Sequence, residues 1–147
     1  MKHLQINFYE NVEDELLKFA VIISKYKGKW VFCKHKERDT FEIPGGRREP
    51  DEPIFKTAER ELREETGALE FNIIPVCVYS VTGKTRVNQT GEESYGMLYF
   101  ADIQSLEKEL HSEMESISFF DELPTEWTYP QIQPLLIQEF LRRVERS

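Results

Sequence analysis

The feature that most restricts the fold of this chain is a charged stretch near its middle, AERELREETGA, residues 58–68. Its composition favours a helix. Pro53 suits the first helical turn, where no backbone N–H is needed, and Gly67 supplies a C-terminal stop. The sequence therefore predicts a helix from Pro53 to about Thr66.

One side of this predicted helix is apolar and should face a core. At about 100° per residue, the apolar positions share one arc: Ile54, Phe55, Ala58 and Leu62. The far side is charged, and there Glu59 can pair with Arg63 at i, i+4. Such a pair is typical of a helix face in contact with water, so the helix should lie on the surface of the core.

Three glutamates follow the edge of the apolar arc. Glu61 and Glu65 lie one turn apart with Glu64 beside them, and like charges at that spacing repel by about 0.2–0.5 kcal/mol per pair. A solvated charge run is one interpretation. Their place at the core edge favours another, because repelling carboxylates become favourable around a divalent cation, and Mg²⁺ prefers such oxygens with waters and phosphates. We expect a metal site on this helix.

Strand patterns occur on both sides of the helix. Runs rich in β-branched and aromatic residues cover residues 18–24, 29–35, 71–81, 95–103 and 116–120. Gly28 predicts a hairpin between the first two runs, and Pro44 ends a short strand within 40–46 and opens a loop. Strands before and after a central helix predict an α/β fold with a mixed β-sheet sandwiched between α-helices.

Two further helices are predicted towards the C-terminus. Residues 105–115 form a short helix, and Pro134 begins an amphipathic one. The apolar face of that last helix holds Leu135, Leu136, Ile137, Phe140, Leu141 and Val144. The polar stretch 82–94 is loop-like, and a lid, a dimer contact and an idle loop all remain open for it. A length of 147 residues predicts one domain over residues 1–147.

Composition excludes several classes of protein. A formal net charge of −8 gives no general electrostatic grip on nucleic acid. No apolar run could span a bilayer, and the N-terminus turns acidic where a secretory signal would turn apolar, so we expect no membrane partner and a cytoplasmic protein. Cys33 and Cys77 belong to no ligand motif and are predicted to be buried thiols.

From Gly46 the sequence reads GRREPDEPIFKTAERELREETGA. This resembles the Nudix box, the signature of the Nudix hydrolase superfamily, at every fixed-identity position, which include Gly46, Glu52 and Gly67. Ala68 is the one soft departure, because the family more often has Ile, Leu or Val there. The flanking stretches FEIPGG and ISFFDELP are also similar to the family, so the resemblance implies the Nudix fold.

The resemblance implies a reaction and a set of roles. Nudix enzymes hydrolyse a nucleoside diphosphate linked to another group with Mg²⁺ or Mn²⁺. By position, the metal ligands would be Glu61, Glu64, Glu65 and the backbone carbonyl of Gly45. Arg60 would orient the glutamates, and Glu52 would brace the loop or join the outer shell of the metal. The general base is either Glu61 or a later acid, Glu113 or Glu115, since family members differ.

Basic and aromatic residues near the predicted site give candidate substrate contacts. Four cations could meet the outer phosphates: Lys34, Arg38, Arg47 and Arg48. Solvated surface charge is the alternative for each of them. Trp127 and Tyr129 could stack on a base or could instead anchor the last helix.

The sequence near the C-terminus narrows the choice of substrate. FFDELP followed by TYPQIQPLL resembles the small bacterial, MutT-like Nudix proteins that convert nucleoside triphosphates, including oxidised guanine nucleotides, to monophosphate and pyrophosphate. Removal of pyrophosphate from a triphosphorylated RNA end is the second interpretation. A non-catalytic nucleotide-binding module is the third, although such a module should have lost box glutamates and none is missing. Nudix domains occur as monomers and as homodimers, and both remain open.

Overall fold

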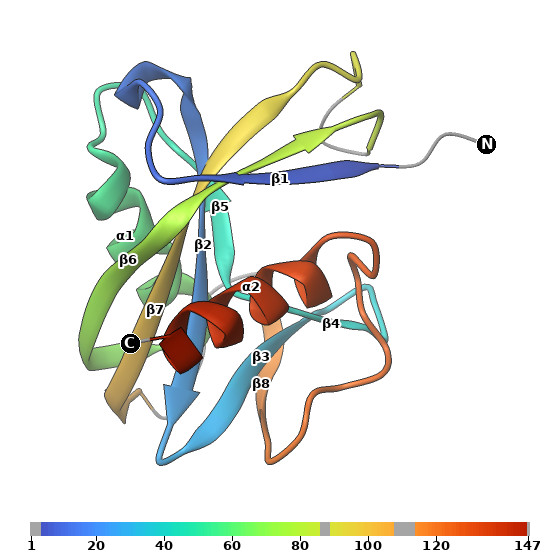
Figure 1. Ribbon diagram of the computed structural model, residues 1–147. Coiled ribbons are helices and arrows are strands. Elements are labelled where there is room, and N and C mark those ends of the chain that lie inside the picture. Colours follow the sequence, from blue (N-terminus) through green and yellow to red (C-terminus); the bar gives the residue numbers. More distant parts are fainter. Residues whose placement is uncertain (1–3, 86–88, 108–113, 147) are drawn as a thin grey trace.

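The computed structural model describes residues 4–85, 89–107 and 114–146 (Figure 1). Its strands are β1 (Gln5–Tyr9), β2 (Leu17–Tyr26), β3 (Lys29–His35), β4 (Phe41–Glu42), β5 (Gly45–Arg47), β6 (Ala68–Thr82), β7 (Ser94–Leu106) and β8 (Met114–Phe120). Its helices are the short 3-10 helix η1 (Asp14–Leu16) and the α-helices α1 (Ile54–Thr66) and α2 (Gln133–Arg146). Within this part of the chain all strands join one mixed sheet, which confirms the predicted α/β class.

Strand β2 is central to the sheet, because it pairs with β7 in parallel and with β3 antiparallel. Its residues are buried on both faces, as expected for a strand covered from two sides. Ala20 and Ile22 pack towards α1, whereas Val21 and Ile23 belong to the core on the α2 side. Because successive side chains of β2 point to opposite faces, the strand contributes to two separate hydrophobic cores.

The sheet forks beside β2. Strands β2 and β3 pair only near their hairpin, and beyond it residues 41–47 lie between them, with β4 on β3 and β5 on β2. The Ile22 N–H donates to the Pro44 carbonyl at 2.8 Å. Pro44 does end β4 as predicted, but the loop predicted after it is wrong, because Gly45 and Gly46 continue as β5. Gly45 lies opposite Val21 and Gly46 lies opposite Ala20 in the pairing of β5 with β2.

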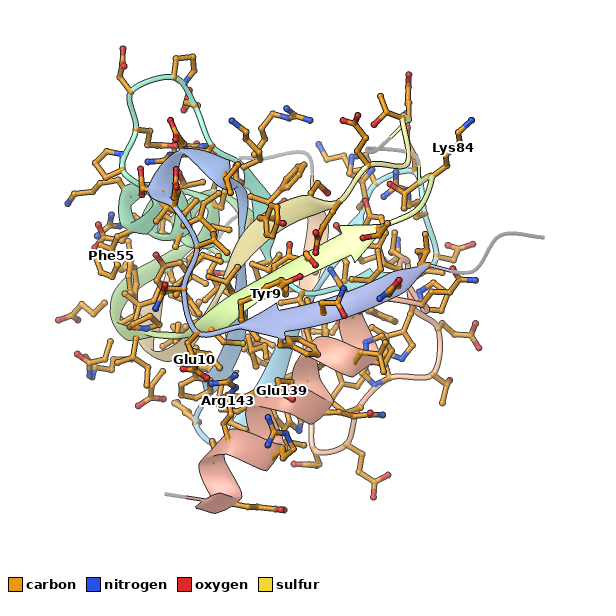
Figure 2. All side chains as sticks on the ribbon, turned by 45° about the horizontal axis from the view of Figure 1, so that its top comes forward. Tyr9, Glu10, Phe55, Lys84, Glu139 and Arg143 are labelled. Atoms are coloured by element: carbon orange, nitrogen blue, oxygen red, sulfur yellow. The ribbon has the colours of Figure 1, made fainter. Side chains whose placement is uncertain are left out.

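Helix α1 packs on one face of the sheet and ends as predicted. Gly67 has a φ of 76° and donates its N–H to the Arg63 carbonyl at 2.9 Å. Ala58 and Leu62 are fully buried, but Phe55, predicted for the core, is 38% exposed at the rim (Figure 2). Its ring lies edge-on to Tyr99, with centroids 5.9 Å apart. In the same turn Ile54 packs against the core and Thr57 is buried, so Phe55 lies outside the buried arc of α1.

The charged face of α1 pairs differently from the prediction. Glu59 binds Lys56 at 3.1 Å, and the Arg63 guanidinium lies 4.9 Å from the centre of the Phe71 ring. The predicted pair of Glu59 with Arg63 is therefore wrong. An aromatic face on β6 competes for the arginine, because an exposed cation–π contact contributes about 0.5–1 kcal/mol and an exposed i, i+4 ion pair about 0.3–0.5 kcal/mol.

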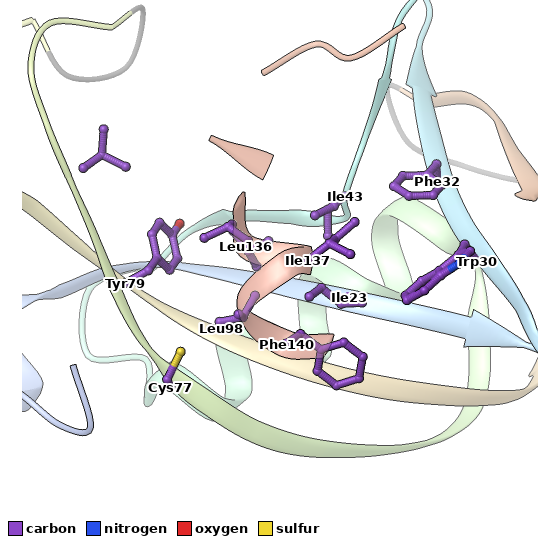
Figure 3. Close-up of a cluster of buried hydrophobic side chains, with 12 residues drawn as sticks. Ile23, Trp30, Phe32, Ile43, Cys77, Tyr79, Leu98, Leu136, Ile137 and Phe140 are labelled. Carbon is purple, nitrogen blue, oxygen red and sulfur yellow. The ribbon is translucent and has the colours of Figure 1, made fainter. Parts of the chain in front are cut away.

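Helix α2 lies across the opposite face of the sheet (Figure 1). Leu136, Ile137 and Phe140 fill the core between α2 and the sheet (Figure 3). The other members of the predicted apolar face are exposed: Leu135, Leu141 and Val144. A helix on a sheet buries one narrow arc, and these side chains lie outside it.

The far half of α2 is tied to the end of β1. Arg143 donates to Glu139 at 2.8 Å and pairs with Glu10 at 3.1 Å (Figure 2). Glu139 also accepts from Arg142. The pair of Arg143 with Glu10 ties the C-terminal half of α2 to the residue that follows β1.

The helix predicted over residues 105–115 is not found where the chain is described. Leu106 ends β7 and Met114 begins β8, while residues 108–113 lie outside the described residues. Cys33 and Cys77 are both buried and unpaired by disulfides, as predicted. None of the helices described here is long and apolar enough to cross a bilayer.

Candidate active site

Arg60 is the centre of the polar contacts around α1. Its Nε and Nη2 donate to the two oxygens of Glu52 at 2.8 and 3.0 Å, and its Nη1 donates to Glu61 at 2.9 Å. A further bond runs from Nη2 to the Arg47 carbonyl at 3.1 Å. The planar guanidinium thus joins helix, preceding loop and β5, in the bidentate geometry that favours arginine over lysine.

Glu52 ties the loop before α1 to the helix. Besides Arg60, its Oε1 accepts from the Thr57 hydroxyl at 2.8 Å and from the Glu49 N–H at 3.1 Å. The Arg60 bonds are the main reason that the pKa of Glu52 falls to about 2. The carboxylate is therefore ionised at neutral pH.

This shift predicts a pH-dependent contribution to stability. A carboxylate whose pKa is lower in the folded than in the unfolded chain stabilises the fold above its ordinary pKa and loses that effect as the pH falls towards the folded value. The ordinary value of 4.5 and the folded value of about 2 set the window. We expect Glu52→Gln to lower the free energy of unfolding at neutral pH, and the difference from the wild type to shrink below pH 4.5 in denaturant titrations. A difference that stayed constant throughout this acid range would contradict the ion pair.

Glu61 lies against β5 at Gly46. A Cβ on Gly46 would come within 2.4 Å of the Glu61 carboxylate, so a glycine is needed to admit it. The Glu61 side chain is 13% exposed. Burial raises the pKa of Glu61, and the Arg60 guanidinium opposes that rise.

Glu65 reaches the neighbouring residue of the same strand. Its Oε1 accepts the Gly45 N–H at 2.7 Å. Burial raises the pKa of Glu65 well above its usual range, the Gly45 bond opposes the rise, and the charges of Glu61 and Glu64 add to it. Glu64 itself is 53% exposed and lies 3.6 Å from Arg60. The three glutamates thus share one edge of α1, beside β5.

These carboxylates do not form a finished coordination shell. Among the described residues no group of three or more acidic, histidine or cysteine side chains converges on one point. The donors nevertheless suit a hard divalent cation, because all are carboxylate oxygens. Glu64 raises the pKa of Glu61, and both raise that of Glu65, so a bound cation would relieve a repulsion that the structure contains.

The two glycines predict separable effects on substitution. Alanine at Gly46 meets a side-chain carboxylate, whereas alanine at Gly45 meets the Ala20 carbonyl oxygen at 2.5 Å. We expect Gly46→Ala to displace Glu61 and lower turnover with a small change in melting temperature. Gly45→Ala should lower the melting temperature markedly, because backbone cannot move aside. Thermal denaturation and turnover of both variants check this, and equal melting temperatures would contradict it.

A cavity of about 270 Å³ lies on the other side of β5. Gly45, Gly46 and Arg47 form one wall, β6 gives Tyr79, and α2 gives Gln133. Much of the remaining lining is apolar, as in sites for small organic ligands. The glycines that contact Glu65 and Glu61 therefore also border the cavity.

The predicted cations are used in different ways. Arg47 lines the cavity and lies 5.1 Å from the centre of the Phe19 ring. Arg48 instead donates to Asp14 at 2.7 Å and to the Glu52 carbonyl at 2.6 Å and does not line the cavity, so its contact with substrate stays a prediction. Its side chain turns to the loop before β2, where these oxygens satisfy the guanidinium.

Lys34 and Arg38 also lie away from the cavity wall. Lys34 is on β3, with its Cα opposite Phe41 of β4. Arg38 pairs with Glu42 at 3.5 Å, and it is Glu42 that lines the cavity. Of the four predicted cations, Arg47 is thus the one that reaches the cavity in the described structure.

The two candidate aromatic residues also lie in different places. Trp127 packs edge-on against Phe32, with centroids 5.3 Å apart, and bridges to Phe41, so it is an anchor. Tyr129 lines the cavity. The candidate bases of the later loop are not placed by the structure: Glu113 lies outside the described residues, and only the backbone of Glu115, in β8, is described.

Sequence reasoning missed Gln133, Glu42 and Tyr79 in the cavity wall. Gln133 starts α2, and its amide oxygen accepts the Ile43 N–H at 2.8 Å. No local pattern marks it, because its partner is distant in sequence. The only signal in the sequence was that Gln133 directly precedes Pro134, where the last helix was predicted to begin. This position indicated that the Gln133 side chain could be fixed in place.

The fold and this site define a class of protein. The family model of the NUDIX domain matches residues 16–137. The chain therefore belongs to the NUDIX family, and the predicted Nudix fold is confirmed. It is a hydrolase of that family, whose members act on nucleotides and generally use divalent metal ions.

Individual relatives are consistent with this assignment. The chain is 34% identical over 122 residues to the Putative 8-oxo-dGTP diphosphatase YtkD of Bacillus subtilis (strain 168), covering 82% of this chain and 73% of YtkD. The crystal structure of the Bacillus subtilis pyrophosphohydrolase BsRppH superimposes with a TM-score of 0.78 at 28% identity, covering 98% of this chain and 91% of that one. An Ap4A hydrolase from C. elegans, with a TM-score of 0.66 at 15% identity over 88% of this chain and 100% of the other, shares the fold alone.

Proposed function

We propose that this protein hydrolyses nucleoside triphosphates, including nucleotides of oxidised guanine, to the monophosphate and pyrophosphate. The observation that carries this proposal is the arrangement around β5. Acidic side chains of α1 contact one side of its two glycines, and a cavity for a small organic ligand borders the other. The identity to YtkD supports the choice of substrate.

Residue roles follow from the contacts. We assign Mg²⁺, with Mn²⁺ as a substitute, to the carboxylates of Glu61, Glu64 and Glu65 together with the Gly45 carbonyl. Bound there, the metal would neutralise phosphate oxygens and lower the pKa of the attacking water. Arg60 holds Glu61 and Glu64 in place, and Arg47 supplies a positive charge at the cavity mouth.

The proton of the attacking water needs an acceptor, and we assign it to Glu61. Its carboxylate is largely buried beside β5 and next to the other proposed metal ligands, where the attacking water would be held. Glu113 and Glu115 are the alternatives, and Glu113→Gln and Glu115→Gln variants would separate them from Glu61. The oxygen of water forms a new P–O bond to one phosphorus of the α–β phosphoanhydride, the P–O bond from that phosphorus to the bridging oxygen breaks, and the products are the nucleoside monophosphate and pyrophosphate.

A second candidate is removal of pyrophosphate from a triphosphorylated RNA end. The similarity to BsRppH, at 28% identity over nearly the whole chain, favours it. The net charge of −8 argues against an extended RNA-binding surface but not against recognition of the first nucleotides of an RNA.

One panel of substrates tests these proposals. Purified protein with Mg²⁺ is given the common nucleoside triphosphates, 8-oxo-dGTP and a triphosphorylated RNA, and pyrophosphate release is measured with and without a chelator. Faster release from free nucleotides supports the first proposal, and faster release from RNA supports the second. Nucleotide binding without any release would overturn both and favour a binding module.

A further inference from the structure

Gln133 has a buried side chain with one half of its amide in use. It is 6% exposed and lies in the cavity wall. Its Oε1 accepts the Ile43 N–H at 2.8 Å. This bond orients the amide, since the reverse orientation would set two donors against each other.

The other half of the amide is the Nε2 donor. No hydrogen bond to the Gln133 Nε2 occurs among the described residues, and none of their fully buried side-chain nitrogen or oxygen atoms lacks a partner. The Nε2 group is therefore not fully buried, and it is accessible from the cavity that Gln133 lines. Such a group can donate to water or to an acceptor on a ligand in the cavity.

The cavity suits a single ring system. Its volume of about 270 Å³ exceeds the roughly 150 Å³ that holds a benzene molecule and lies below the usual range for a whole drug-sized ligand. The Tyr79 and Tyr129 rings and the Leu136 side chain line it. A nucleobase fits these walls, because its faces are apolar and its edges carry acceptors and donors.

We propose that Gln133 selects bases that carry a keto oxygen over bases that carry an amino group at the same ring position. This inference rests on the proposed nucleotide hydrolysis. The Nε2 group of Gln133 would donate to the O6 of guanine or the O4 of uracil, and it would oppose the amino group of adenine or cytosine. Guanine and 8-oxo-guanine both carry O6, so Gln133 would not separate oxidised from normal guanine.

Gln133→Glu tests this most directly. The new carboxylate keeps an acceptor for the Ile43 N–H but turns the donor into a second acceptor. We expect the ratio of kcat/KM for GTP over ATP, and for UTP over CTP, to fall by roughly 10- to 100-fold. The ratio for 8-oxo-dGTP over dGTP should change little.

Gln138→Glu is the matched control. Gln138 is exposed on the same helix, so this variant adds the same charge without touching the cavity. Its base ratios should equal those of the wild type. A uniform fall for all four nucleotides in Gln133→Glu would assign Gln133 to structure and overturn the selection.

Binding measurements keep the inference separate from the proposed reaction. If the wild type released no pyrophosphate from any nucleotide, the proposed function would fail, yet calorimetric titration with GMP and AMP would still report base selection. Tighter binding of GMP to the wild type, lost in Gln133→Glu, supports the inference. Equal affinities for GMP and AMP in the wild type would sink it, and melting temperatures of the variants would show that both are folded.

Discussion

Glu64→Gln and Glu65→Gln are each expected to slow pyrophosphate release by about a hundredfold or more, with the fold intact. Glutamine retains one oxygen but not the negative charge that a divalent cation requires. Glu65 as glutamine can still accept the Gly45 N–H, and Glu64 is largely exposed, so neither change should remove a core contact. Turnover, Mn²⁺ binding and melting temperature are measured together.

Glu59→Gln is the control for these variants. It removes the same charge from the same helix, but Glu59 pairs with Lys56 on the side away from β5. Its turnover and Mn²⁺ affinity should match the wild type. Near-normal turnover of both Glu64→Gln and Glu65→Gln, or an equal loss in the control, would end the metal assignment.

Arg60→Lys is expected to lower turnover by about 10- to 100-fold, although the positive charge remains. Lysine cannot reproduce the forked contact with both oxygens of Glu52 while also holding Glu61. The loss of these bonds should also destabilise the fold by about 1–2 kcal/mol. Steady-state kinetics at several Mg²⁺ concentrations and denaturant titration measure the two effects.

The same exchange at Arg63 separates position from charge. Arg63 lies over the Phe71 ring on the exposed side of α1, so Arg63→Lys should leave turnover unchanged. We further expect the Mg²⁺ concentration at half-maximal rate to rise in Arg60→Lys, because Glu61 and Glu64 lose their common partner. An unaltered Mg²⁺ dependence would show that Arg60 acts only on stability.

Local patterns were sufficient for α1 and its acidic edge. Helical periodicity depends on residues three and four apart, so the burial of Ala58 and Leu62 and the stop at Gly67 could be predicted from the chain alone. Phe55 and Arg48 show the limit of such patterns. Which arc of a helix is buried, and which carbonyls lie near a guanidinium, depends on parts of the chain that the pattern does not contain.

The sequence by itself determined the strands of the β2 hairpin, the helix α1, and the line of carboxylates with the family to which they belong. Only the tertiary structure decided that residues 41–47 enter the fork between β2 and β3, and that a cavity lies beyond them. The bond between Ile43 and Gln133 joins residues 90 positions apart. A contact at that separation arises from the packing of α2 against one face of the sheet, which no local spacing of residues encodes.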